Sequence, residues 1–88
     1  MLHILVHEND DGSVVRLSGR LAEEFVAEAR QVCSSAAAPL RIDATELQEA
    51  DADGFALLVE LIEAGASVEG LSGYFAMRIQ ALRERDGQ

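Results

Sequence analysis

Two acidic residues with close spacing, Asp51 and Asp53, are the nearest approach to a catalytic pair in this 88-residue sequence. A pair of carboxylates can serve as general acid and general base. The same residue type is also favoured at the start of a helix, where it accepts hydrogen bonds from free backbone N–H groups. An apolar segment follows both residues directly, so their position favours helix capping over catalysis.

The histidines and the single cysteine provide neither a metal site nor a reactive nucleophile. His3 and His7 share one face of an expected strand and lie about 13 Å apart at roughly 3.3 Å per residue, which is too far for a shared metal ion. Cys33 has no partner for a disulfide and lies in the apolar stripe of an expected helix, where a buried, unreactive thiol is typical. The sequence also lacks a nucleotide-type glycine loop, an HExxH motif and a Gly-x-Ser-x-Gly motif. We therefore expect a protein that is not an enzyme, with no catalytic residue, cofactor or metal site.

Apolar periodicity predicts the elements that must position these residues. Period-two alternation predicts a strand over residues 2–7, and Asp11-Gly12 predicts a tight turn into a second strand over residues 14–17. Short strands are expected at residues 40–43 and 66–71, with a loop at residues 44–50 between the first of them and the next helix.

Helical spacing predicts three helices. The first runs from Leu21 through Cys33, and the second is capped by Asp51 and ended by Gly65. The third begins after Ser72 or Gly73, buries Phe75, Ile79 and Leu82, and is followed by a frayed charged tail at residues 83–88.

The order of these elements, β-β-α-β-α-β-α, predicts an α/β fold with a mixed four-stranded sheet and helices packed against it. The first two strands form an antiparallel hairpin, and right-handed crossovers make the later strands parallel to their predecessors. No repeat or linker divides the chain, so we expect one domain over residues 1–88.

The second helix offers a candidate docking surface. Four of its residues are expected to face the sheet: Phe55, Leu58, Val59 and Ile62. Leu57 and Leu61 are then displaced to one flank, where they continue the row begun by Asp53. An apolar stripe beside a helix start can bind a partner protein. The alternative is that a neighbouring helix of the same chain covers both leucines, and the sequence leaves the two interpretations open.

Charge restricts the partners. Sixteen acidic residues against seven basic ones, all arginine, give a net charge of −9 and a pI near 4.4. This balance argues against sequence-independent binding to nucleic acid or to an anionic membrane, and it favours a basic surface on a partner protein. The longest apolar run, residues 55–59, is too short for a membrane-spanning helix, and no secretory leader precedes the single cysteine. We therefore expect a cytoplasmic protein without direct membrane insertion.

Four segments of the chain together resemble the STAS domain family, named for sulfate transporters and anti-sigma-factor antagonists. They are residues 14–21 (VVRLSGRL), 40–43 (LRID), 65–72 (GASVEGLS) and the motif at 51–54 (DADG) with the apolar helix after it. The order and spacing of these motifs extend the resemblance over about residues 2–82. It implies a non-enzymatic interaction module, and it implies that the family's last strand and helix are missing after Leu82.

The resemblance also implies a function and a site. In bacterial partner switching, the unphosphorylated domain binds a kinase-like anti-sigma factor and frees the sigma factor, and phosphorylation falls on the serine or threonine directly before the motif's glycine. That phosphoacceptor-equivalent position is Asp53 here, and Ala52 precedes it. Neither residue accepts phosphate by that chemistry, so we expect no phosphorylation switch. The expected partner interface comprises Asp51, Ala52, Asp53, Gly54, Leu57 and Leu61.

An alternative from the same family remains open. Small free-standing members act as cytosolic accessory subunits of ABC-type lipid transport systems and pack on the ATPase without being phosphorylated, which fits the missing serine at least as well. The absent strand leaves two interpretations: the domain is a minimal version of the family's, or the exposed edge is covered by a partner or by a second copy in a homodimer. Nucleotide or small-ligand binding, which some members show, has no support here from a glycine loop or a basic pocket.

Overall fold

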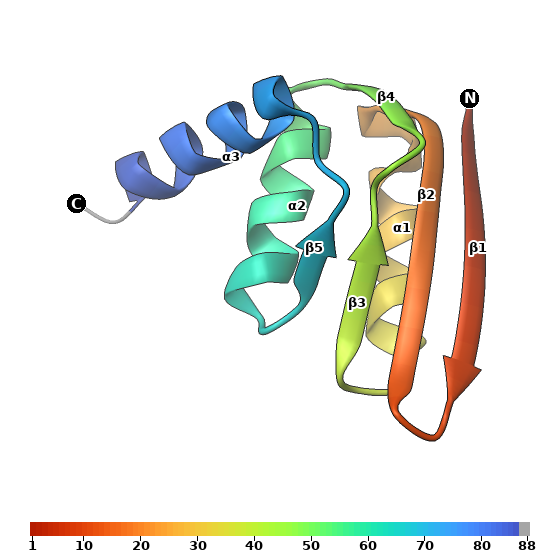
Figure 1. Ribbon diagram of the computed structural model, residues 1–88. Coiled ribbons are helices and arrows are strands. Elements are labelled where there is room, and N and C mark those ends of the chain that lie inside the picture. The colour runs from red at the N-terminus through yellow and green to blue at the C-terminus, as the bar shows by residue number, and fades with distance from the viewer. Residues whose placement is uncertain (87–88) are drawn as a thin grey trace.

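A mixed sheet of five strands carries three helices in the computed structural model, which describes residues 1–86 (Figure 1). The strands are β1 (Leu2–Asn9), β2 (Gly12–Leu21), β3 (Leu40–Asp43), β4 (Leu47–Ala50) and β5 (Ser67–Glu69). The helices are α1 (Glu23–Ser35), α2 (Ala52–Glu63) and α3 (Gly73–Asp86). The predicted α/β class, with a mixed sheet and packed helices, is confirmed.

The strand pairing follows the predicted directions. β1 and β2 form an antiparallel hairpin with a continuous register from Leu2 opposite Gly19 to Asn9 opposite Gly12. β3 pairs parallel with β2, and β5 pairs parallel with β3. The order across the sheet is β1-β2-β3-β5. β1 therefore forms one edge of the sheet (Figure 1).

The prediction of a four-stranded sheet with a loop at residues 44–50 was wrong by one strand, because Leu47–Ala50 forms β4. β2 is ten residues long and pairs with β3 only from Ser13 to Arg16, so its far end offers free backbone groups. β4 pairs parallel with that end, with an irregular register between Gly19 and Arg20. The segment is a strand because of this neighbour, which its own composition does not reveal.

Two helix boundaries also differ from the prediction. Leu21 is the fully buried last residue of β2, and α1 begins at Glu23. The expected frayed tail is helical as far as Asp86, because its glutamate and arginine residues are good helix formers. Residues 87 and 88 of that tail lie outside the described residues.

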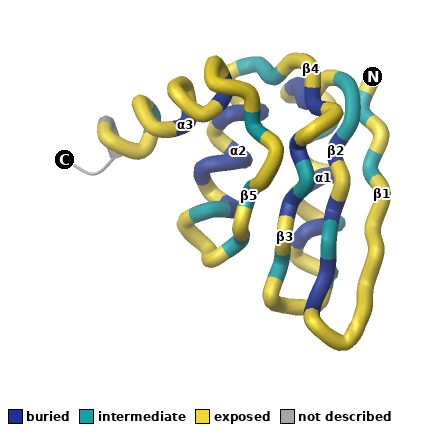
Figure 2. The backbone as a smooth tube through the Cα atoms, viewed as in Figure 1, coloured by how far each residue is buried: buried dark blue, intermediate teal, exposed yellow. Residues whose placement is uncertain are grey.

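The core lies between one face of the sheet and the helices α1 and α2 behind it in Figure 1. Buried residues are concentrated in β2 and α2, whereas β1 is exposed along most of its length (Figure 2). The sheet supplies Val15, Leu17 and Ile42 to this core, and α2 supplies Phe55 and Leu58. Burial of such side chains is the main favourable term in folding, at about 25 cal/mol per Å² of apolar surface.

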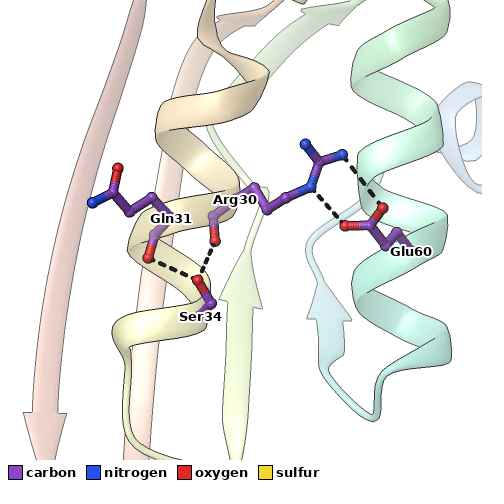
Figure 3. A network of polar contacts seen from close by, with 4 residues as sticks. All are labelled: Arg30, Gln31, Ser34 and Glu60. Atoms are coloured by element: carbon purple, nitrogen blue, oxygen red, sulfur yellow. Dashed lines mark hydrogen bonds and ion pairs between the residues drawn. The ribbon is translucent and has the colours of Figure 1, made fainter.

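The helices α1 and α2 are also joined by an ion pair on their outer surface (Figure 3). The Arg30 guanidinium donates to both carboxylate oxygens of Glu60, over 2.8 and 3.3 Å. This hydrogen-bonded arginine lowers the pKa of Glu60. The Ser34 hydroxyl, one turn after Arg30, donates to backbone carbonyls of α1 (Figure 3). Both side chains of the pair are half exposed, so it contributes little to stability.

Candidate functional site

The start of α2 lies at the same end of the sheet as the start of α1, and Asp51 connects the two (Figure 1). Asp51 is the N-cap of α2, and its Oδ1 accepts a hydrogen bond of 2.8 Å from the backbone N–H of Gly54. Its Oδ2 accepts a second bond of 2.8 Å from the backbone N–H of Glu23, the first residue of α1. The predicted capping role of Asp51 is confirmed, and it extends to a second helix.

The double cap explains how α1 begins without a capping residue of its own. Its N-cap position is Ala22, which has no side-chain acceptor. Asp51 provides that acceptor from 28 positions further along the chain. The sequence carried one signal of this arrangement, an alanine where a serine, threonine or aspartate is usual.

The surroundings of Asp51 stabilise the charged form of its carboxyl group. The N–H group of Glu23, then that of Gly54, holds the pKa of this carboxyl below its usual range, and the positive charge of Arg20 lowers the pKa further. Both carboxylate oxygens already accept hydrogen bonds. Asp51 is therefore fixed as a charged cap, and the arrangement does not poise it for proton transfer at neutral pH.

Gly54 is required by close packing of α2 on the end of β2. A Cβ atom at this position would overlap the backbone carbonyl oxygen of Leu21. The backbone N–H of Asp51 also donates to that oxygen, over 3.1 Å. The glycine of the motif thus lets the first turn of α2 approach the strand, while Asp51 fixes its position.

Asp53 and Ala52 lie on the outside of the same turn. Both are exposed, and Asp53 is the acidic residue in the first turn of α2. A carboxylate in this position interacts favourably with the positive end of the helix dipole. The two aspartates of the motif therefore have different roles: Asp51 is hydrogen-bonded to the backbone of two helices, whereas Asp53 is exposed to solvent.

The predicted exposed stripe of Leu57 and Leu61 was wrong. Leu57 is 1% exposed and Leu61 is 8% exposed, and both belong to the core. Leu61 and Cys33 of α1 line one hollow beneath the Arg30–Glu60 pair, so α1 occupies this flank of α2. The alternative left open by the sequence, cover by a neighbouring helix, is the correct one.

The beginning of α3 contributes residues that the sequence pattern did not indicate. The Arg78 guanidinium carbon lies 5.1 Å from the centre of the Phe55 ring and 5.9 Å from that of the Tyr74 ring. Arg78 also donates to the Tyr74 hydroxyl over 3.0 Å. Tyr74 is 55% exposed and stands edge-on to Phe55, with 6.5 Å between the ring centres. The only signal for these residues was their helical spacing on the side of α3 away from Phe75 and Ile79.

Tyr74 connects this group to the double cap. A shallow hollow of about 300 Å³ is lined by Tyr74, Asp51 and Arg20, among others. Arg20 forms an ion pair with Glu49 across β2 and β4, over 3.6 Å. We call Arg20, Asp51, Asp53, Tyr74 and Arg78 the cap surface. It combines a fixed carboxylate, a free carboxylate, an exposed aromatic ring and two arginines, which is a composition suited to protein recognition.

The other residues considered for chemistry lie apart from the cap surface. His3 and His7 are exposed on β1 and share one face of the sheet. Cys33 is buried in α1, and this burial raises the pKa of its thiol. Within residues 1–86, no three histidine, cysteine or acidic side chains are grouped so that they could hold a metal ion. The same residues contain no helix of the length and apolarity needed to cross a bilayer.

Comparison with known proteins identifies the fold. The structure resembles that of the anti-sigma factor antagonist SpoIIAA in its unphosphorylated form, with a TM-score of 0.73 over 89% of this chain and 82% of that one. The chain has a STAS-like fold. The two sequences are 19% identical over the matched region. No protein-family model and no curated protein sequence matches this chain.

Proposed function

We propose that this chain is a non-enzymatic interaction module of the anti-sigma-factor-antagonist type, which docks a kinase-like anti-sigma factor in the cytoplasm. One observation supports this proposal above the others. The chain shares its fold with SpoIIAA, an anti-sigma factor antagonist. Asp53, which we assign to the phosphoacceptor-equivalent position, is exposed at the start of α2. The partner would meet the start of α2 and the adjoining start of α3.

The cap surface supports a revised interface. Leu57 and Leu61 are buried in the core, so they are not part of the revised interface. Asp53 and Ala52 are exposed and would touch the partner, together with Tyr74 and Arg78 of α3, which packs against α2. Asp51 and Gly54 would act by holding the first turn of α2 in place. A surface that is already rigid loses little conformational entropy on binding.

The charge of Asp53 supports a module without a phosphorylation switch. Phosphoserine carries about −1.5 to −2 charges, whereas an aspartate carries one and has fewer acceptor oxygens. Converting a partner from about 1% to 99% bound requires a differential free energy of roughly 5.5 kcal/mol. One exposed carboxylate at a helix start supplies a small part of that. Asp53 would therefore form a permanent contact with a basic surface, in keeping with the net charge of −9.

Binding to a purified partner tests the proposal. The probe is a purified kinase-type anti-sigma factor from the same organism, and the measurement is calorimetric titration. We expect Asp53→Arg to weaken binding at least about tenfold, as charge reversal at a protein interface does. Asp10→Arg is the matched control, because Asp10 is an exposed aspartate in the β1–β2 turn at the opposite end of the sheet (Figure 1). Equal affinity of both variants, or no binding by the wild type, would refute the proposal.

A restored serine tests the phosphoacceptor position separately. We expect the kinase to phosphorylate Asp53→Ser and to leave the wild type and Ala52→Ser unmodified. Intact-mass measurement after incubation with ATP reports the modification. Phosphate on Ala52→Ser alone would show that Asp53 does not occupy the acceptor position.

The second candidate is an accessory subunit of an ABC-type lipid transport system. The observation that favours it is the absence of serine and threonine from residues 51–54, because such a subunit requires no phosphorylation. The same titration against a purified ATPase of an ABC-type lipid transport system from the same organism separates the candidates. Binding to the ATPase that Asp53→Arg weakens, with none to an anti-sigma factor, would select the transport function.

A further inference from the structure

β1 presents an open row of backbone hydrogen-bonding groups along one edge of the sheet (Figure 1). The backbone N–H of Arg20 donates to the carbonyl oxygen of Met1 over 3.1 Å, so these two residues form a hydrogen-bonded pair of the antiparallel ladder. Such pairs alternate along a ladder, and the register of β1 with β2 is continuous. The odd-numbered residues of β1 therefore bond to β2. The N–H and C=O groups of Leu2, Ile4, Val6 and Glu8 point outward, away from the sheet.

The side chains of the first seven residues of the chain carry no formal charge, and apart from the two histidines they are apolar. Leu5 is 63% exposed and Val6 is 47% exposed, on opposite faces of the strand. Residues 1–7 contain no carboxylate and no arginine or lysine in a chain whose net charge is −9. Sheet edges are usually protected from pairing by charged side chains, proline or a bulge, and this segment has none of them.

The residues of this segment are nearly symmetric about Leu5. Residues 3–7 are His-Ile-Leu-Val-His, which is a palindrome except that Ile4 and Val6 differ, and both of these are β-branched. A two-fold symmetric contact requires a surface that is complementary to itself. Antiparallel pairing of two identical strands places each residue opposite its counterpart across the axis, so a nearly palindromic strand brings like side chains together.

We propose that β1 pairs antiparallel with β1 of a second copy of this chain, with the two-fold axis at Leu5, to form one continuous sheet through both copies. In this register Leu5 lies opposite Leu5 of the second copy, Ile4 opposite Val6, and His3 opposite His7. The outward backbone groups of Ile4 and Val6 then bond to each other, and the Leu5 pair is the closely spaced, non-hydrogen-bonded type. Such apolar cross-strand pairs stabilise a sheet.

Neighbouring registers match less well. An axis at Val6 would place Ile4 opposite the carboxylate of Glu8 and Leu5 opposite His7. An axis at Ile4 would place Leu5 opposite His3. Because no acidic residue lies between residues 1 and 7, the Leu5 register also brings together the part of the edge where two strongly acidic chains repel each other least. Paired edge strands bury less than a standard interface of roughly 1,600 Å², so the dimer should dissociate on dilution.

Sedimentation equilibrium of the full chain tests the association. We expect the wild-type mass to rise with concentration from 9.5 kDa toward twice that value. Leu5→Lys places two like charges at the axis and should weaken dimerisation at least about tenfold. Met77→Lys is the matched control, because Met77 is 62% exposed on α3 and lies outside the edge. Val6→Pro should also abolish the dimer, because it removes an outward N–H and leaves the bonds to β2 intact.

Cysteine cross-linking tests the register in a Cys33→Ala background. We expect Leu5→Cys chains to form a disulfide-linked dimer under mild oxidation and Met77→Cys chains to remain monomeric. Chains carrying His3→Cys should cross-link to chains carrying His7→Cys when the two are mixed. Cross-linking through Ile4→Cys or Val6→Cys in preference to Leu5→Cys would overturn the register. A wild-type mass that stays at 9.5 kDa up to about 1 mM would overturn the dimer itself, since weak interfaces populate by that concentration.

Discussion

At the scale of single residues, the two aspartates of one short motif have different roles. Asp51 accepts the backbone N–H groups of Glu23 and Gly54 and so completes the starts of two helices. Asp53, two positions later, is exposed and available to a partner. Residue type and spacing indicated a cap at Asp51, but the second hydrogen bond comes from a helix that precedes it by 28 residues.

Replacing Asp51 by asparagine should lower the stability of the fold. The asparagine side chain would keep one acceptor oxygen, but its amide group would face the second backbone N–H. We expect the melting temperature at pH 7 to fall by roughly 5 °C, as is typical for loss of a helix cap in a small domain. Asp53→Asn is the matched control and should cost less, because Asp53 is exposed and is not the N-cap.

The wild type and the Asp51→Asn variant should also differ in their pH dependence. The pKa of Asp51 is lower in the folded chain than in the unfolded chain, where it is about 3.9. Its stabilising contribution is therefore fully present above that value and is lost as the pH falls through the folded-state pKa. The difference in melting temperature between the two proteins should be constant from pH 7 to about pH 5 and shrink below pH 4. A difference that is unchanged at pH 3 would contradict the ionised double cap.

At the scale of elements, packing partners decided which surface of α2 is free. Helical periodicity correctly selected Phe55, Leu58 and Val59 as core residues, because a helix on a sheet buries one face. Leu57 and Leu61 lie on the flank of that face, and their burial depends on where α1 lies. That position is a tertiary property, and periodicity within α2 does not contain it.

The contact between α2 and β2 predicts opposite effects for two glycines. Gly54→Ala should destabilise the fold by about 1–3 kcal/mol, because the new Cβ would overlap the Leu21 carbonyl oxygen and force α2 to shift. Gly73→Ala, at the start of α3, meets no atom within 4 Å and should be neutral or stabilising by up to about 1 kcal/mol. Urea denaturation measures both. Equal effects of the two substitutions would show that α2 does not approach β2 this closely.

At the scale of the whole molecule, the arginines and acids are distributed so that excess negative charge remains on the surface. In the described part of the chain, four arginines pair with acids, Arg16 with Asp43, Arg20 with Glu49, Arg30 with Glu60 and Arg41 with Glu69. Exposed pairs of this kind contribute little to stability. The apolar core therefore holds the fold together, and we expect the excess of acids to favour a partner with a basic surface.

If residues 1–88 form one domain, all parts should unfold in a single transition. Tyr74 is the only tyrosine and the sequence has no tryptophan, so tyrosine fluorescence reports on the start of α3. Far-UV circular dichroism reports on all helices and strands together. We expect the two urea transitions to coincide, because α3 packs on the core through Phe75 and Ile79. A fluorescence transition at lower urea would show that α3 unfolds independently of the sheet.

Local patterns in the chain were enough to predict the order and direction of most elements, the core face of α2 and the cap at Asp51. Each of these follows from local periodicity or from contacts between residues a few positions apart. Long-range contacts were needed to establish that Leu47–Ala50 is a strand, that Leu57 and Leu61 are buried, and that Asp51 also caps α1. These features depend on contacts between distant parts of the chain, and no local pattern in the sequence specifies which residues make those contacts.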